Sequence, residues 1–350
     1  MTAEAIMMKL CKLCEEYKDD EIILDKINNY IESQLPNLLL KYKDREKKKK
    51  ELENEVNEFT NNFLYSKSVE YYYIKKTDLF IKYNGKHFKI INNDDLLHNI
   101  FTDINTNKLI RKKKQQIKNN IMKHIKENDL TKSIPNSYTI QFIIDYLTPI
   151  FIKDRNTTKY FLTILGDSIL KKKTENIYYI LPSCKDFLVY LKEHLQSYFK
   201  KSISLEGVFK YKYIEELHKN HRLVEFNENK QINNNWDIFF RNHILDIFAV
   251  AVHYSNRYKS AEDFLENHLH NCNSKRKILY FRENNPEKII KDFMKNYITK
   301  VEEINITKME LYYLWLYFIK ESKIPNILDI DSFHKQISKM NYKYCEENQK

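Results

Sequence analysis

The sequence predicts a mostly α-helical protein that also contains a small antiparallel β-hairpin sheet, which places it in the α+β class. Apolar residues recur at helical spacing along most of the 350 residues, and this periodicity is the main signature of amphipathic helices. In one short stretch the spacing changes to alternation around an Asn-Gly pair, a strong local signal of a hairpin. The apolar content of 42% is sufficient for a sizeable buried core.

The first segment, residues 1–64, predicts helices followed by a charged spacer. Apolar positions between residues 3 and 42 recur at helical spacing, with breaks near residues 18–20 and at Pro36. Residues 41–58 are almost purely charged, and a block of lysines there precedes a block of glutamates. Opposite charges about one turn apart stabilise a solvated helix, so we interpret this stretch as a spacer.

The second segment, residues 65–200, begins with the predicted hairpin. Asn84 and Gly85 supply the two positive-φ positions that a type I′ turn requires. Pairing across this turn places Lys82, His87 and Lys89 on one face, which is basic, while the opposite face packs on the core. A helix then begins at Asn93. Further elements are expected as helices over 114–130, 139–147, 157–170 and 185–199 and as a strand over 176–181.

The third segment, residues 201–235, is an irregular connection in which residues 208–213 have strand character. The fourth, residues 236–350, is a helical domain with the very apolar run 244–252 in its core. Near the C-terminus a helix over 308–320, a turn and a second helix from Asp329 form a helix-turn-helix pattern. A strand starting at Tyr342 would make this a winged-helix-like end.

Charge and surface chemistry indicate a polyanionic partner. The net charge is +11 and the pI is about 9.0, and such an excess attracts nucleic acid or an acidic surface. An AT-rich codon bias toward lysine explains the same excess without any function, and this alternative stays open. The residues that we predict to contact nucleic acid are Lys82, Lys89, Arg111, Lys112, Lys113, Lys114, Ser332, Lys335, Gln336 and Lys339.

Most nucleotide-driven enzymes are excluded by the scarcity of glycine. Only three glycines occur in the whole chain, and neither a phosphate-binding loop nor a dinucleotide turn can be built from them. Many carboxylates are present, for instance Asp94, Asp95, Asp145, Asp154 and Asp167, but their spacing singles out no catalytic pair. We therefore predict no catalytic residue and no cofactor.

Two cysteine-containing motifs are candidate metal or redox sites. Cys11 and Cys14 share one side of a helix, and their expected role is core packing. His268, His270 and Cys272 have ligand-like spacing, but a zinc site would require a fourth group from elsewhere. The sequence thus predicts no metal.

Four runs of the sequence carry a resemblance to a known family: EYYYIKKTDLFIKYNGKHFKIINNDDLLHNI, TKYFLTILGDSILKK, NIYYILPSCKDFLVYL and VAVHYSNRYKSAEDFLENH. They resemble a family of uncharacterised proteins of nucleocytoplasmic large DNA viruses, the giant viruses, over most of residues 65–340. The hairpin and its following helix are also similar to the domain that precedes the helicase in poxvirus-type primase-helicases. Residues 311–340 are similar to the C-terminal winged helix of those proteins, although no Walker A motif of the motor is present.

The resemblance implies a viral protein made in the host cytoplasm and located in the viral factory or the virion. Together with the basic surface it predicts a non-catalytic nucleic-acid-binding accessory protein of viral genome replication or expression. DNA is favoured over RNA, viral replication or expression proteins are further expected partners, and no membrane is involved. Two alternatives stay open, a helical protein–protein scaffold in a viral replication or translation assembly and a metal-dependent nuclease.

Overall fold

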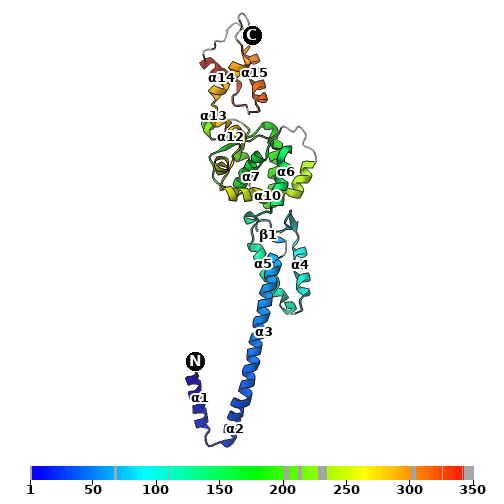
Figure 1. The fold of residues 1–350 in the computed structure, drawn as a ribbon, viewed down its shortest axis with the longest axis vertical. Helices are drawn as coiled ribbons and strands as arrows, with labels where there is room; N and C mark the ends of the chain where they lie inside the picture. Colours follow the sequence, from blue (N-terminus) through cyan, green and yellow to red (C-terminus); the bar gives the residue numbers. More distant parts are fainter. Residues whose placement is uncertain are drawn as a thin grey trace. The chain divides into compact units, whose positions relative to one another are not determined.

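The computed structural model describes residues 2–66, 69–108, 110–200, 205–211, 215–227, 235–299, 301, 305–324, 326–340 and 342. Helices dominate, and the strands form small sheets, as the predicted fold class requires (Figure 1). The chain forms two compact units. The first contains Met1–Lys67 and Asp94–Met122, and the second contains Ser68–Asn93 and Lys123–Lys350. The hairpin and the helix after it, which the sequence placed in one segment, therefore fall in different units.

The first unit begins with a series of helices that leave most of their side chains in solvent. Asp20 caps the second helix by accepting the Ile23 N–H at 3.2 Å. No residue of the first helix is buried and Cys11 is exposed, so the expected core role of Cys11 is wrong. An apolar stripe at helical spacing predicts that a helix forms, but it does not show which element, if any, packs against that stripe. The elements are α1 (Ala3–Glu16), α2 (Glu21–Asn29), η1 (Tyr30–Gln34), α3 (Leu35–Asn61) and η2 (Asn62–Ser66).

The rest of the first unit is more compact. It is formed by α4 (Asn93–Asn105), η3 (Ile110–Lys113) and most of α5 (Lys114–Glu127). These helices bury a row of isoleucines, among them Ile100 and Ile117. In α3 only Val56 and Thr60 are buried, which agrees with the predicted solvated spacer.

The three-stranded antiparallel sheet opens the second unit. Its strands β1 (Glu70–Ile74), β2 (Leu79–Tyr83) and β3 (Phe88–Ile91) lie in the order β1-β2-β3. Lys82 and Lys89 share one face of the sheet as predicted, but the register is shifted by two residues. Tyr83 is paired with Phe88 and Lys82 with Lys89, whereas a two-residue turn would pair Tyr83 with Lys86. The predicted type I′ turn is wrong, since φ is positive at Gly85 but not at Asn84. Instead the Asn84 side chain accepts the backbone N–H groups of residues 86 and 87 and closes a four-residue loop.

The core of the second unit is built around two long helices, α7 (Arg155–Ile169) and α10 (Asn235–Tyr258) (Figure 1). The predicted apolar run 244–252 is buried in α10. The helices α6 (Ser137–Ile150) and α8 (Lys185–Phe199) pack against this pair, and η4 (Leu130–Lys132) lies beside it. Asp154 caps α7 by accepting two backbone N–H groups.

A second, parallel sheet separates two apolar clusters of the second unit. Its strands β4 (Ile177–Tyr179), β5 (Phe209–Lys210) and β6 (His221–Leu223) lie in the order β5-β4-β6. Tyr178 belongs to the larger cluster, whereas Tyr179 and Leu223 belong to the C-terminal one. The sheet is thus covered on both faces, as parallel sheets usually are. The connecting elements are η5 (Pro182–Cys184), α9 (Leu205–Val208) and η6 (Glu215–Asn220).

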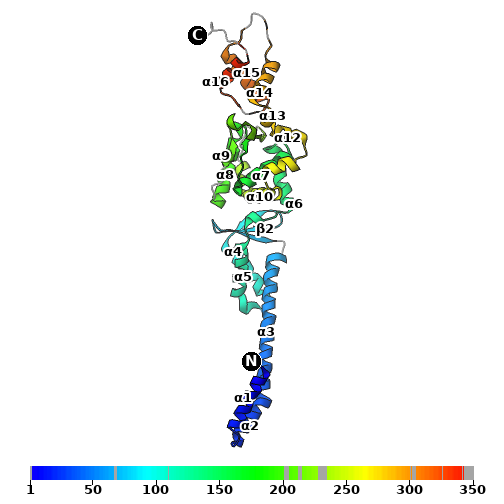
Figure 2. The same cartoon turned by 90° about the vertical axis from the view of Figure 1, so that its left-hand side faces the viewer.

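Short helices lead from the core to the C-terminal cluster (Figure 2). The helix-turn-helix pattern is present as two helices that pack around Trp315 and Phe333. The wing expected after it lies outside the described residues, except for Tyr342, which is not in a strand. The elements are α11 (Ala261–Asp263), η7 (Phe264–His268), α12 (Cys272–Ile278), α13 (Tyr280–Glu283), α14 (Pro286–Tyr297), α15 (Lys308–Glu321) and α16 (Ile330–Lys339).

Candidate functional site

The predicted nucleic-acid contacts on the hairpin lie together on one face of the sheet, which we call its outer face. The rings of Tyr71 and Phe80 on that face are buried, Lys82 is half-buried and Lys89 is exposed. Lys82 of β2 is directly opposite Lys89 of β3. The face that carries them points away from the one that contributes Ile81 and Tyr83 to the larger core cluster. Like charges directly opposite each other in a sheet are destabilising. This pair is therefore a locally unfavourable arrangement that a bound anion would relieve.

A hollow borders the same outer face. It is lined by residues of β2 and β3 and by Lys126 of α5. The Lys126 ammonium lies 5.6 Å from the centre of the Tyr73 ring, within the range of a cation–π contact. Lys126, as a third lysine, and the Tyr73 ring thus belong to the same part of the second unit as Lys82 and Lys89.

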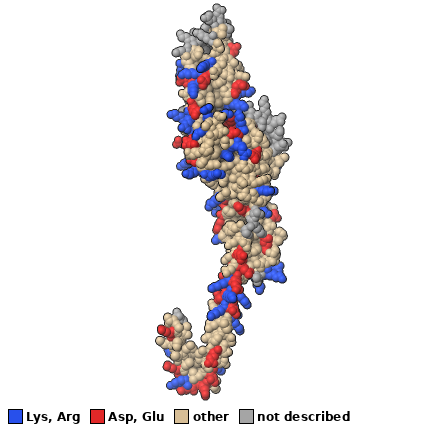
Figure 3. Space-filling view, viewed as in Figure 1, with Lys and Arg blue, Asp and Glu red and all other residues tan. Residues whose placement is uncertain are grey.

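The remaining predicted contacts lie on three other elements. Arg111, Lys112 and Lys113 form η3 and Lys114 begins α5, all in the first unit. On α16, Lys335 and Lys339 are exposed, and Ser332 and Gln336 share that face of the helix. On the face of the second unit seen in Figure 3, Lys and Arg are interspersed with Asp and Glu. In the second unit the structure thus brings the predicted contacts together in two groups, Lys82 with Lys89 on the sheet and the four residues on one face of α16.

His87 is not on the basic outer face where the sequence placed it. Its ring Nδ1 lies 2.9 Å from Oδ2 of Asp246, a fully buried residue of α10. His243, one turn earlier on α10, places its own Nδ1 2.9 Å from the same oxygen. The four-residue turn before β3 is what allows this, because it carries the His87 ring back toward α10.

The second carboxylate oxygen of Asp246 holds the hairpin itself. Oδ1 accepts the backbone N–H of Phe88 at 2.7 Å. One carboxylate thus receives three N–H groups from two histidines and a strand, which is how a buried carboxylate is normally satisfied. The three side chains form what we call the His-Asp-His cluster, namely His87, His243 and Asp246.

Aromatic rings surround the His-Asp-His cluster. The Phe142 ring centre lies 5.0 Å from that of His87 and 4.8 Å from that of His243. Tyr138 and Tyr146, one turn to either side of Phe142 on α6, extend the row, and Tyr138 is half exposed. Partial burial raises the pKa of the Tyr146 phenol above its ordinary value. The rings fix the orientation of both imidazoles.

The metal candidate expected from sequence spacing is not assembled. His268 Nε2 lies 3.8 Å from a carboxylate oxygen of Asp263, and Cys272 is exposed. In the described part of the chain, the three residues placed so that they could hold an ion are those of the His-Asp-His cluster. The His-Asp-His cluster was not predicted from the sequence. Asp246 within the apolar run 244–252 was a signal, because a buried carboxylate requires a partner.

Three of the carboxylates named from the sequence have structural roles. Asp145 is paired with Arg155, and Asp154 is the cap of α7. Asp167 accepts the Ser255 hydroxyl and the Ala261 N–H, and burial raises the pKa of this carboxyl. These three carboxylates therefore do not supply the converging set that a two-metal nuclease needs.

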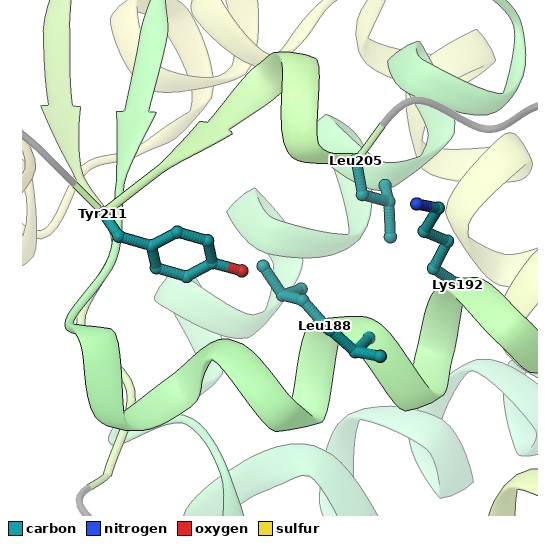
Figure 4. A pocket seen from close by; sticks show the side chains of 5 residues that line it. Leu188, Lys192, Leu205 and Tyr211 are labelled. Carbon is teal, nitrogen blue, oxygen red and sulfur yellow. The ribbon is translucent and has the colours of Figure 1, made fainter.

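A small hollow beside α8 is lined mainly by apolar side chains and has few polar groups. It is lined by Leu188, Val189, Lys192, Leu205 and Tyr211, and the Tyr211 ring reaches across toward α8 (Figure 4). One hydroxyl and one amine are the polar groups of this set. The lining indicates packing at the junction of α8 and α9 more than a ligand site.

Comparison of the chain with protein-family models, curated proteins and solved structures gives no match. The resemblance to giant-virus proteins therefore stays a prediction. Among the described helices, none is both long and apolar enough to cross a membrane.

Proposed function

We propose that this protein binds nucleic acid, DNA in preference to RNA, at the outer face of the β1–β3 sheet. The role would be that of a non-catalytic accessory protein of viral genome replication or expression. The observation that supports the proposal most is the direct pairing of Lys82 with Lys89, because two opposed ammonium groups gain most from a shared phosphate backbone. The neighbouring Lys126 and Tyr73 add a cation and a ring suited to a base or sugar.

The test is a salt titration of binding to labelled oligonucleotides, followed by fluorescence anisotropy. Single-stranded DNA, duplex DNA and RNA of one sequence are compared with the full chain and with the double variant Lys82→Gln/Lys89→Gln. On duplex DNA we expect the slope of log affinity against log salt to become shallower by about 1.8, which is about 0.9 for each phosphate that the variant no longer neutralises. On single strands the slope should change by about 1.4.

The matched control is Lys288→Gln/Lys320→Gln, which removes two exposed lysines of α14 and α15. We expect this double variant to keep a slope close to that of the unchanged chain. An equal decrease in both double variants would contradict a defined interface and favour lysines spread by codon usage. No binding of the unchanged chain in dilute buffer would overturn the proposal.

A second candidate function, a helical scaffold, is favoured by the exposed apolar side chains of the N-terminal helices. We infer that a second copy of this chain covers Leu38, Leu39 and Leu40 by antiparallel pairing of α3. In that arrangement the lysine block 47–50 of each copy faces the glutamates of the other, whose first is Glu51. The exposed residues are Ile6, Met7, Met8, Leu13, Ile22, Leu35, Leu38, Leu39 and Leu40.

Light scattering coupled to gel filtration measures this association. We expect a mass of twice 42.7 kDa for the full chain, and a shift to one copy in Leu38→Lys/Leu39→Lys, because desolvation of two ammonium groups opposes burial of that face. Ile134→Lys, at an exposed isoleucine of the second unit, is the control and should leave the mass unchanged. A single copy at all concentrations would rule out this scaffold.

A further inference from the structure

We propose that His87, His243 and Asp246 form a binding site for one divalent first-row transition ion, with Zn²⁺ as the ion that fits best. One ring nitrogen of each histidine and one Asp246 oxygen all lie within 4.8 Å of one another. Two residues come from α10 and the third from the turn before β3, so the site exists only when the fold has formed. The inference is independent of nucleic-acid binding.

The distances suit a shared ion. Ligand atoms at about 2.0–2.2 Å from one Zn²⁺ lie about 3.0–3.6 Å apart at usual coordination angles. Both Nδ1 atoms are 2.9 Å from Oδ2 of Asp246. Each nitrogen–oxygen distance therefore needs to lengthen by only a few tenths of an ångström to match a shared ion. Each neutral ring keeps one proton, which then resides on Nε2 instead of Nδ1.

The surroundings of Asp246 are those of a carboxylate held for ligation. Its Oδ1 accepts the Phe88 N–H at 2.7 Å, which leaves Oδ2 directed at the two rings. Hydrogen bonding of a ligating carboxylate by a second layer of groups is the usual feature of metal sites. The Asp246 side chain is fully buried, whereas those of His87 and His243 are 23% and 22% exposed. The two imidazoles are thus partly accessible to solvent, although the carboxylate is not.

The donor types select the class of ion. Two imidazoles and one carboxylate suit Zn²⁺ and its neighbours, whereas Mg²⁺ and Ca²⁺ favour sites made of oxygen ligands. Three protein ligands leave at least one position for water or for an oxygen of a bound molecule, as in catalytic zinc sites. The site thus has the ligand count of an open centre.

The experiment uses the full chain freed of metal by dialysis against a chelator. Co²⁺ is added while visible d–d absorption is recorded, and Zn²⁺ is then used to displace it. We expect one ion per chain, and loss of affinity of at least 100-fold in His87→Ala and in His243→Ala. Far-UV circular dichroism and thermal unfolding verify that each variant is folded, and His87→Gln and His243→Gln provide a second pair that preserves more of the packing.

The matched control is His268→Ala/His270→Ala, which removes the histidines of the unassembled candidate. It should bind Co²⁺ as the unchanged chain does. Two outcomes would overturn the proposal: absence of a saturable Co²⁺ or Zn²⁺ signal in the unchanged chain, or equal affinity in the folded His87 and His243 variants. Because no nucleic acid is present, neither outcome bears on the oligonucleotide experiment.

Discussion

Replacement of Gly166 by alanine is expected to destabilise the second unit by about 3 kcal/mol or more, the upper end of overpacking costs. A Cβ at this position would lie 2.1 Å from the carbonyl oxygen of Ala251 and 2.7 Å from its carbonyl carbon. Both atoms belong to the backbone of α10, so no side chain can rotate away. The two long core helices must separate to admit one methyl group. Urea unfolding of the purified variant at 25 °C measures the cost.

Gly85→Ala provides a comparison of a different kind. The added Cβ would lie 3.2 Å from the Asn136 side chain, and φ at Gly85 is +81°. The expected cost is about 1–2 kcal/mol, which is that of the left-handed backbone for a residue with a Cβ. If Gly166→Ala unfolds at the same urea concentration as Gly85→Ala or a higher one, close backbone contact of α7 and α10 is contradicted.

Local patterns in the sequence were sufficient for the elements whose partners are close in the chain. The faces of the hairpin strands follow from alternation, although the four-residue loop shifts the register by two residues from the one that a two-residue turn gives. The last two helices follow from apolar spacing around Trp315 and Phe333. The parallel sheet was not assembled from the sequence because its outer strands are only two and three residues long. Pairing of β4 with β6 is set by burial of both faces, and no local spacing reports it.

The candidate site was hidden for a related reason. His87 and Asp246 are 159 residues apart in the sequence, so neither local spacing nor a motif connects them. Strand alternation alone predicts His87 on the basic face. In the structure His87 belongs to the four-residue loop, and its ring points toward Asp246 of α10. From the sequence, the three glycines were informative only for the loops that they cannot form, whereas the main constraint on Gly166 is the carbonyl of Ala251. Each of these errors comes from a tertiary contact that overrides a correct local rule.

Removal of the Asp246 carboxylate is the other change with a large expected effect. Asp246→Ala should reduce the free energy of unfolding by about 3 kcal/mol, because it leaves the Phe88 N–H and two imidazole N–H groups without their buried acceptor. The hairpin would also lose its attachment to α10. Urea unfolding of metal-free protein measures this loss of unfolding free energy without a contribution from ion binding.

Asp246→Asn separates the backbone bond from the histidine bonds. Its amide oxygen can still accept the Phe88 N–H, while its NH₂ group can donate to rings that move their proton to Nε2. We therefore expect a smaller loss, about 1–2 kcal/mol, and about 1 kcal/mol for His87→Ala or His243→Ala. A loss in Asp246→Ala no greater than that in the single histidine variants would contradict the attachment. In that case we would assign the Asp246 carboxylate to ion binding and not to stabilisation of the fold. These are the two roles that a buried acid between two imidazoles can have.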